Sequence, residues 1–226
     1  MKLYTREWGS GDKVAVLIHG VISDSRGWWR VGPALAERGY RVIAVDLPGH
    51  GSSPRSSSYS PELLASSLLE SVPAQPEIAI GHSLGGLTLA VAVERLLPKR
   101  AIYSDPGFRV PGGAADMFAQ IKTLPREMHE QFHPGWSSEE IDIELLTIAD
   151  WDETFISTMT MQGKDFTPPV IVPSLVQLAD PSFLVSPEFA EELRDKGFEV
   201  RVVPGAEHTI HRHLLGDFMS SLDGWI

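Results

Sequence analysis

Short apolar runs rich in Val and Ile alternate along the chain with longer segments whose apolar residues recur at helical spacing. Runs of this kind are typical of buried parallel strands, and the segments between them are typical of helices that cover a sheet. The pattern therefore predicts an α/β protein with a mostly parallel sheet flanked by helices. The strands are expected at residues 14–18, 41–45, 77–80, 101–103, 174–178 and 198–203.

Helical periodicity between these runs predicts the covering helices. Pro61 and Pro187 each follow a serine, which suits a serine N-cap followed by proline in the first turn. The helices are expected at residues 28–38, 61–71, 84–97, 187–196 and 213–222.

The segment 107–169 departs from the alternation because it contains no Val-rich run. Its residues 137–153 include seven acidic side chains and no basic one, a pattern typical of a solvated helical face. We expect an inserted helical cap at 107–169 and a core domain formed by 1–106 and 170–226.

Composition narrows the class of protein. Hydrophobic residues make up 42% and charged residues 22%, as in ordinary globular proteins. The net charge of −11 disfavours nucleic acid and anionic membranes as partners.

No apolar stretch is long enough to span a membrane, and the first residues do not resemble a signal peptide, so a cytoplasmic protein is expected. The absence of cysteine excludes disulfides and thiolate chemistry. Nothing in the sequence implies a cofactor or predicts an oligomeric state.

The segment Gly81-His82-Ser83-Leu84-Gly85 lies between an expected strand and an expected helix. This is the context of a nucleophile elbow, in which a sharp turn exposes a serine and the flanking glycines avoid collisions. The sequence therefore predicts Ser83 as a nucleophile. Backbone N–H groups of Leu84, at the helix start, and of Val21, after the His19-Gly20 turn, are the expected donors to an oxyanion.

A serine hydroxyl needs a base within hydrogen-bond reach before it becomes a good nucleophile. His208 follows the last expected strand, and the carboxyl ends of parallel strands meet at one edge of the sheet, where Ser83 also emerges. His208 is thus the predicted general base. His19 and His50 belong to tight turns, and alternation along the strand is expected to direct His82 away from the site.

Four motifs occur in a fixed order: Leu17-Ile-His-Gly20, Asp46-Leu-Pro-Gly-His-Gly-Ser52, Gly81 to Gly85, and Gly205-Ala-Glu-His208. Together they resemble the α/β-hydrolase superfamily over most of the chain outside the cap. The resemblance implies an α/β-hydrolase fold and a Ser-His-Asp triad whose acid lies between the serine and the histidine in the sequence.

Two aspartates could supply that acid. Asp180 follows the strand 174–178, where the family usually places it, but the usual Gly-Asp-x-Asp pattern would put the acid at Ser182. Asp105 follows the strand 101–103, a position that some family members use. The sequence therefore leaves both Asp180 and Asp105 as candidates for the acid.

A zinc site is the competing interpretation of His129-Glu-Gln-Phe-His133, which matches the His-Glu-x-x-His pattern. However, Pro134 and Gly135 end any helix there, and no clear third ligand follows. We interpret the segment as the end of a cap helix and expect no metal.

The expected function is hydrolysis of a small apolar or aromatic ester, lactone or thioester through an acyl-enzyme. The same triad also supports carbon–carbon bond hydrolysis or acyl transfer, and a non-catalytic ligand-binding protein on a hydrolase fold is the alternative of another class. Haloalkane dehalogenase activity is not expected, because that reaction needs an aspartate nucleophile at the position that Ser83 occupies. The residues that could line an apolar pocket are Val21, Ile22, Trp28, Trp29, Phe108, Met117, Phe118, Met159 and Met161.

Overall fold

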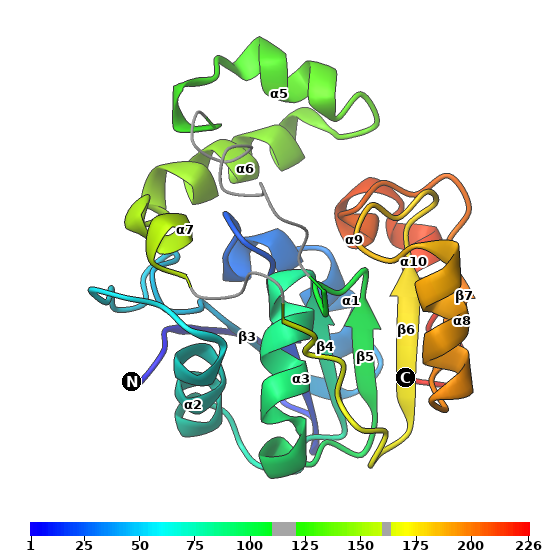
Figure 1. The fold of residues 1–226 in the computed structure, drawn as a ribbon. Helices are drawn as coiled ribbons and strands as arrows, with labels where there is room; N and C mark the ends of the chain where they lie inside the picture. Colours follow the sequence, from blue (N-terminus) through cyan, green and yellow to red (C-terminus); the bar gives the residue numbers. More distant parts are fainter. Residues whose placement is uncertain (110–120, 160–163) are drawn as a thin grey trace.

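The structure, a computed structural model, describes residues 1–109, 121–159 and 164–226. Its centre is a seven-stranded sheet in the order β1-β3-β2-β4-β5-β6-β7 (Figure 1). Neighbouring strands are parallel except β1 and β3, which pair antiparallel. The strands are β1 (Thr5–Trp8), β2 (Lys13–Ile18), β3 (Tyr40–Val45), β4 (Ile78–His82), β5 (Ala101–Ser104), β6 (Ser174–Leu178) and β7 (Glu199–Val202).

The predicted mostly parallel sheet flanked by helices is confirmed, and the six expected strands correspond to β2 through β7. The sequence analysis missed β1, which is short and polar and lies at the edge of the sheet. An edge strand is partly exposed on both faces, so it lacks the continuous apolar run that marks the buried strands.

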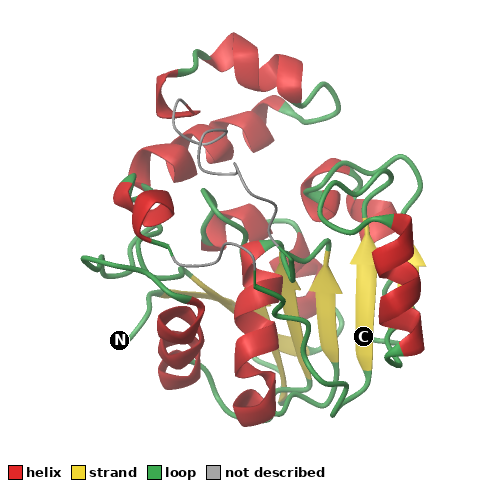
Figure 2. Cartoon of the chain, in the orientation of Figure 1, coloured by secondary structure: helices red, strands yellow, loops and turns green. Residues whose placement is uncertain are grey.

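Helices cover both faces of the sheet (Figure 2). Alternate residues of β2 separate the two layers, because Val16 and Ile18 pack into one hydrophobic cluster and Ala15 and Leu17 into the other. The first cluster includes residues of α2 (Pro61–Ser71), α3 (Leu84–Leu96) and α8 (Pro187–Asp195). The second includes residues of α1 (Val31–Ala36), α9 (Ile210–His213) and α10 (Leu215–Ser220).

The serine caps expected before two of these helices are confirmed. Ser60 accepts a hydrogen bond from the N–H of Leu63, and Ser186 accepts one from Phe189, with proline in the first turn of both helices. Two other helices differ from expectation. The first is divided into the 3-10 helix η1 (Ser25–Trp28) and α1, and the last is interrupted at Leu214 between α9 and α10.

The chain between β5 and β6 includes residues 107–169, the segment expected to form an inserted cap, which we call the insert. Its described helices are η2 (Ile121–Thr123), α5 (Arg126–Phe132), α6 (Ser138–Asp150) and α7 (Thr154–Thr158). They lie beyond the carboxyl ends of the central strands (Figure 1). Among residues 1–109, 121–159 and 164–226, the structure contains no helix that could span a lipid bilayer.

A buried carboxylate ties the insert to the core. Glu140 of α6 is 1% exposed; its Oε2 lies 2.6 Å from Nε of Arg212 in α9, and its Oε1 lies 3.0 Å from Nε1 of Trp29. Arg212 also donates to the backbone carbonyl of Glu140. Because the two charges are desolvated together and share several hydrogen bonds, they fix α6 over the end of the sheet.

Candidate active site

Ser83 occupies a sharp turn between β4 and α3. Its backbone has φ 52° and ψ −112°, a conformation that a residue with a side chain rarely adopts. The turn is held by the N–H of Ser83, which donates to the carbonyl of Ser104 at 3.0 Å. A Cβ at Gly81 would meet the backbone of Gly85, and a Cβ at Gly85 would meet the carbonyl of Ile18. Glycine is therefore required on both sides of the serine.

His208 is paired with an aspartate. Its Nδ1 lies 2.6 Å from Oδ2 of Asp105. An ionised carboxylate can only accept, so Nδ1 carries a proton, and in the neutral ring Nε2 then has the lone pair. The imidazole is thus in the tautomer that a general base needs.

Asp105 lies directly after β5 with its side chain fully buried. Its second oxygen, Oδ1, accepts the N–H of Ala179 at 3.2 Å, and its own N–H donates to the carbonyl of Gln177 at 2.7 Å. Since β5 is the neighbour of β4 in the sheet, Asp105 emerges one strand away from Ser83.

Asp180 is exposed and makes its contacts with the backbone of the loop before His208. Its N–H donates to the carbonyl of Ala206 at 3.0 Å, and its Oδ2 lies 3.4 Å from the N–H of Gly205. The structure therefore brings Asp105, and not Asp180, into contact with the imidazole of His208.

His82 lies beside His208, contrary to the expectation that strand alternation directs it away from the site. The two ring centroids are 4.7 Å apart, and His82 Nε2 donates to the backbone carbonyl of His208 at 3.0 Å. Burial, reinforced by the neighbouring His208, lowers the pKa of His82 well below its ordinary value, so the ring is neutral. His82 links the elbow to the loop that carries His208.

The turn before Val21 is fixed by His19. Its Nε2 accepts the N–H of Leu47 at 2.8 Å, so its Nδ1 carries the proton and donates to the carbonyl of Gly20 at 2.6 Å. Because that carbonyl and the N–H of Val21 belong to one planar peptide, the bond also fixes the direction of the Val21 N–H. A Cβ at Gly20 would lie 3.2 Å from Cβ of Ser83, which places this turn against the elbow.

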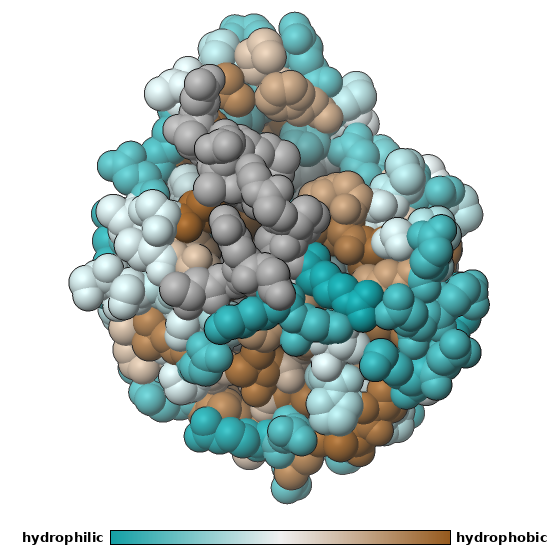
Figure 3. Space-filling model, in the orientation of Figure 1, coloured by the Kyte–Doolittle hydropathy of each residue, from teal (hydrophilic) through white to brown (hydrophobic). Residues whose placement is uncertain are grey.

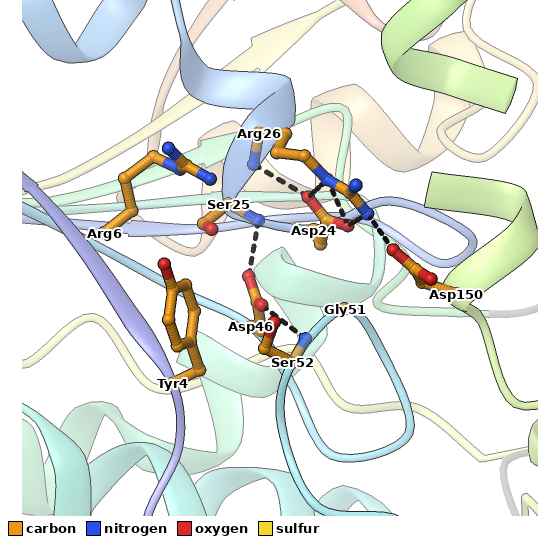
Figure 4. A pocket seen from close by; sticks show the side chains of 9 residues that line it. All are labelled: Tyr4, Arg6, Asp24, Ser25, Arg26, Asp46, Gly51, Ser52 and Asp150. Atoms are coloured by element: carbon orange, nitrogen blue, oxygen red, sulfur yellow. Dashed lines mark hydrogen bonds and ion pairs between the residues drawn. The ribbon is translucent and has the colours of Figure 1, made fainter. Parts of the chain in front are cut away.

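Polar contacts join the loop after β3 to η1, and η1 to α6 (Figure 4). Asp46 accepts the N–H of Ser25 at 2.7 Å and that of Ser52 at 2.9 Å, which joins this loop to η1. Arg26 of η1 pairs with Asp24 at 2.5 Å and with Asp150 of α6 at 2.7 Å. These contacts border a small polar cavity of about 80 Å³, large enough for a few water molecules. The motif from Asp46 to Ser52 thus has a supporting role.

The histidines of the His-Glu-x-x-His pattern both lie near Glu144, and His133 also contacts Glu207. His129 Nδ1 lies 3.1 Å from Oε1 of Glu144, while His133, just after α5, has its Nδ1 2.9 Å from Oε2 of Glu207. Within residues 1–109, 121–159 and 164–226, no group of three potential ligands is arranged to hold a metal ion. Glu207 precedes His208, so the contact with His133 joins the insert to the histidine loop.

The apolar residues proposed for a pocket have mixed positions. Trp28 is fully buried and stacks on His211, with ring centroids 4.1 Å apart. Phe108 is also fully buried and packs on Tyr103, so both belong to the core. Three other candidates lie outside the described residues: Met117, Phe118 and Met161.

Sequence reasoning missed Phe183. It lies in the loop after β6, is 58% exposed, and has its ring centroid 4.5 Å from that of His208. The one feature of the sequence that could have indicated this role is a large apolar residue in a loop, directly after Asp180, Pro181 and Ser182.

The elbow, the contact of His208 with the buried Asp105, and the central sheet define a protein with an α/β-hydrolase framework. The sequence model of the alpha/beta hydrolase family matches residues 15–216, and the chain therefore belongs to this family. A curated relative, the Pimeloyl-[acyl-carrier protein] methyl ester esterase of Methylococcus capsulatus, is 34% identical over 150 residues, covering 66% of this chain and 50% of the relative. The chain spans about half the length of the first curated relatives that it matches.

Solved structures resemble the fold over almost the whole chain. An esterase from Exiguobacterium antarcticum superposes with a TM-score of 0.79 at 18% identity, covering 99% of this chain and 94% of that one. The enol-lactonase from Burkholderia xenovorans LB400 gives a TM-score of 0.79 at 19% identity, covering 99% and 95%. At 18% and 19% sequence identity, this structural similarity establishes the fold alone.

Proposed function

We propose that the protein is a serine hydrolase that cleaves small-molecule carboxylic esters through an acyl-enzyme. Ser83 is the nucleophile, His208 the general base and Asp105 the acid that orients it. Backbone N–H groups of Val21 and Leu84 bind the oxyanion. The esterase names of the curated relatives support ester cleavage as the reaction class.

The observation that carries this proposal is the 2.6 Å contact between His208 Nδ1 and Asp105 Oδ2, made by a fully buried carboxylate. A buried carboxylate beside an imidazole stabilises the imidazolium that forms when the ring accepts a proton. This arrangement prepares His208 to accept the proton of a nearby hydroxyl.

In the acylation step, Ser83 Oγ attacks the ester carbonyl carbon while its proton passes to Nε2 of His208. The carbonyl oxygen becomes an oxyanion, which the N–H groups of Val21 and Leu84 stabilise by hydrogen bonding. The carbon–oxygen bond to the alcohol then breaks, and His208 returns the proton to the leaving alkoxide. The acyl group remains on Ser83.

Deacylation repeats these steps with water. Water gives a proton to His208 and attacks the acyl carbonyl carbon, and the bond to Ser83 Oγ breaks as the serine regains its proton. The products are a carboxylic acid and an alcohol. Asp105 keeps its negative charge throughout and holds the imidazole in one orientation.

A fluorophosphonate probe tests the nucleophile directly, because an activated serine displaces fluoride from phosphorus and becomes covalently labelled. We expect one label on the wild-type protein, mapped to Ser83 by peptide mass, and no label on Ser83→Ala. His208→Ala should slow labelling by about a thousandfold, as expected for loss of the base. Ser57→Ala, which alters an exposed loop serine, is the matched control and should label at the wild-type rate.

Steady-state assays on a panel of esters and lactones decide the reaction class. Turnover of esters that disappears in Ser83→Ala supports the proposal. Tight ligand binding by a folded wild-type protein that neither labels nor turns over any substrate would instead favour a non-catalytic binding protein.

A further inference from the structure

Phe183 places an exposed aromatic ring against the candidate general base. It is 58% exposed, although a phenylalanine gains most from burial, and its ring centroid lies 4.5 Å from that of His208. Hydrophobic residues reach the surface close to the position of α9 (Figure 3). An exposed apolar group beside reacting atoms is positioned to gain contact area when a substrate binds.

The backbone around Phe183 is held on both sides. Ser182 Oγ accepts the N–H groups of Leu184 at 3.3 Å and Val185 at 3.0 Å, which closes a tight turn around the phenylalanine. Val185 is 3% exposed and anchors the turn in the core. On the other side, the N–H of Asp180 donates to Ala206, in the loop that carries His208. The turn and the histidine loop are therefore joined.

The chemistry of the reaction indicates which part of the substrate meets this ring. His208 must deliver a proton to the leaving oxygen, so the alcohol portion of the ester lies beside the imidazole when the bond breaks. The acyl portion is held on Ser83 and outlasts the departure of the alcohol. A ring packed against His208 is thus on the path of the alcohol portion.

We propose that Phe183 is a specificity-determining residue that contacts the alcohol portion of the substrate and favours esters of aromatic or large apolar alcohols. This inference rests on the proposed function, because it requires His208 to protonate the leaving group. It assigns a recognition role to the loop after β6, whose aspartate, Asp180, does not contact the imidazole.

Two ester series test the assignment. In the first, the acyl group is constant and the alcohol changes from methyl to benzyl; in the second, the alcohol is constant and the acyl chain lengthens from acetyl to hexanoyl. Phe183→Ala should lower the benzyl-to-methyl ratio of kcat/KM about five- to tenfold, the effect of losing apolar contact with one aromatic ring. The dependence on acyl length should stay as in the wild type. Phe183→Leu should keep part of the benzyl preference.

Phe132→Ala is the matched control, since Phe132 is 54% exposed and lies on α5 of the insert. It should leave both series unchanged. An equal loss for methyl and benzyl esters, or a loss that follows acyl length, would overturn the role of Phe183. Fluorophosphonate labelling separates this result from failure of the proposed function: Phe183→Ala should still be labelled at Ser83, whereas an unlabelled wild-type protein would remove the basis of both.

Discussion

Nδ1 of His208 lies 2.6 Å from Oδ2 of Asp105, although the two residues are 103 positions apart in the sequence. The contact is possible because Asp105 follows β5, the neighbour of the strand that ends at the Ser83 elbow, and because the loop after β7 folds back over that edge. Asp180 follows β6 and turns outward to the backbone of the histidine loop. Mutation of the two aspartates is therefore expected to affect the reaction rate differently.

Asp105→Asn should lower kcat for ester hydrolysis by about a thousandfold or more, because the amide cannot stabilise an imidazolium and favours the wrong tautomer. Asp180→Asn should retain kcat within about threefold, since its contacts are with backbone groups near the surface. Steady-state kinetics with one ester, combined with the rate of fluorophosphonate labelling, measures both variants. A larger loss in Asp180→Asn than in Asp105→Asn would reverse the assignment.

His82 is expected to act as a positioning residue. His82→Leu removes the N–H that holds the backbone carbonyl of His208, and the resulting displacement of the imidazole should lower kcat about ten- to a hundredfold with KM nearly unchanged. His82→Gln can still donate to that carbonyl and should recover most of the rate. If KM rises while kcat is preserved, or if Gln recovers nothing, His82 does not act through the position of His208.

Glu140 is expected to be a major determinant of stability. Glu140→Ala leaves the guanidinium of Arg212, 4% exposed, without its carboxylate, which should lower the free energy of unfolding by about 3–5 kcal/mol. Urea denaturation followed by tryptophan fluorescence measures the loss. Asp142→Ala on the same helix is the control: its partner Arg126 is solvated, so little measurable change is expected. Similar losses of unfolding free energy in both variants would show that the buried Glu140–Arg212 pair stabilises the protein no more than an exposed pair does.

Stability should fall as the pH drops below about 6.5, the ordinary pKa of histidine. Burial lowers the pKa of His19, His50, His82 and His211 in the folded chain. Between the lowered values and 6.5 the unfolded state therefore binds more protons than the folded state, and the free energy of unfolding decreases with decreasing pH. Urea denaturation at pH 7 and at about pH 5.5 measures this loss.

His211→Phe isolates one of these contributions, because the new ring can keep the stacking on Trp28 but cannot bind a proton. The loss of stability between pH 7 and about pH 5.5 should become smaller by about 1 kcal/mol. Phe218→Leu, which alters a neighbouring ring without changing a titratable group, should destabilise the protein equally at both pH values. An unchanged pH dependence in His211→Phe would show that the histidine is not held neutral.

Local sequence patterns were sufficient to predict six strands of the sheet, most of the covering helices, and the candidate nucleophile and base. These features depend on local patterns. Continuous apolar runs identify buried strands, and the glycines around Ser83 are required by a turn in which a Cβ would meet backbone. The edge strand β1 lacked such a pattern and was missed.

Which aspartate contacts His208 could be read only from the folded chain, because it depends on how strands distant in the sequence are ordered and where their loops turn. For the same reason, the sequence did not predict that His82 contacts the histidine loop or that Phe183 contacts the imidazole. Local periodicity specifies which face of an element is buried, but it carries no information about which loop lies opposite. Asp105 and Asp180 both follow parallel strands of the sheet, and they are distinguished by the position of β5 beside β4 and by the contacts of Asp180 with the backbone of the histidine loop.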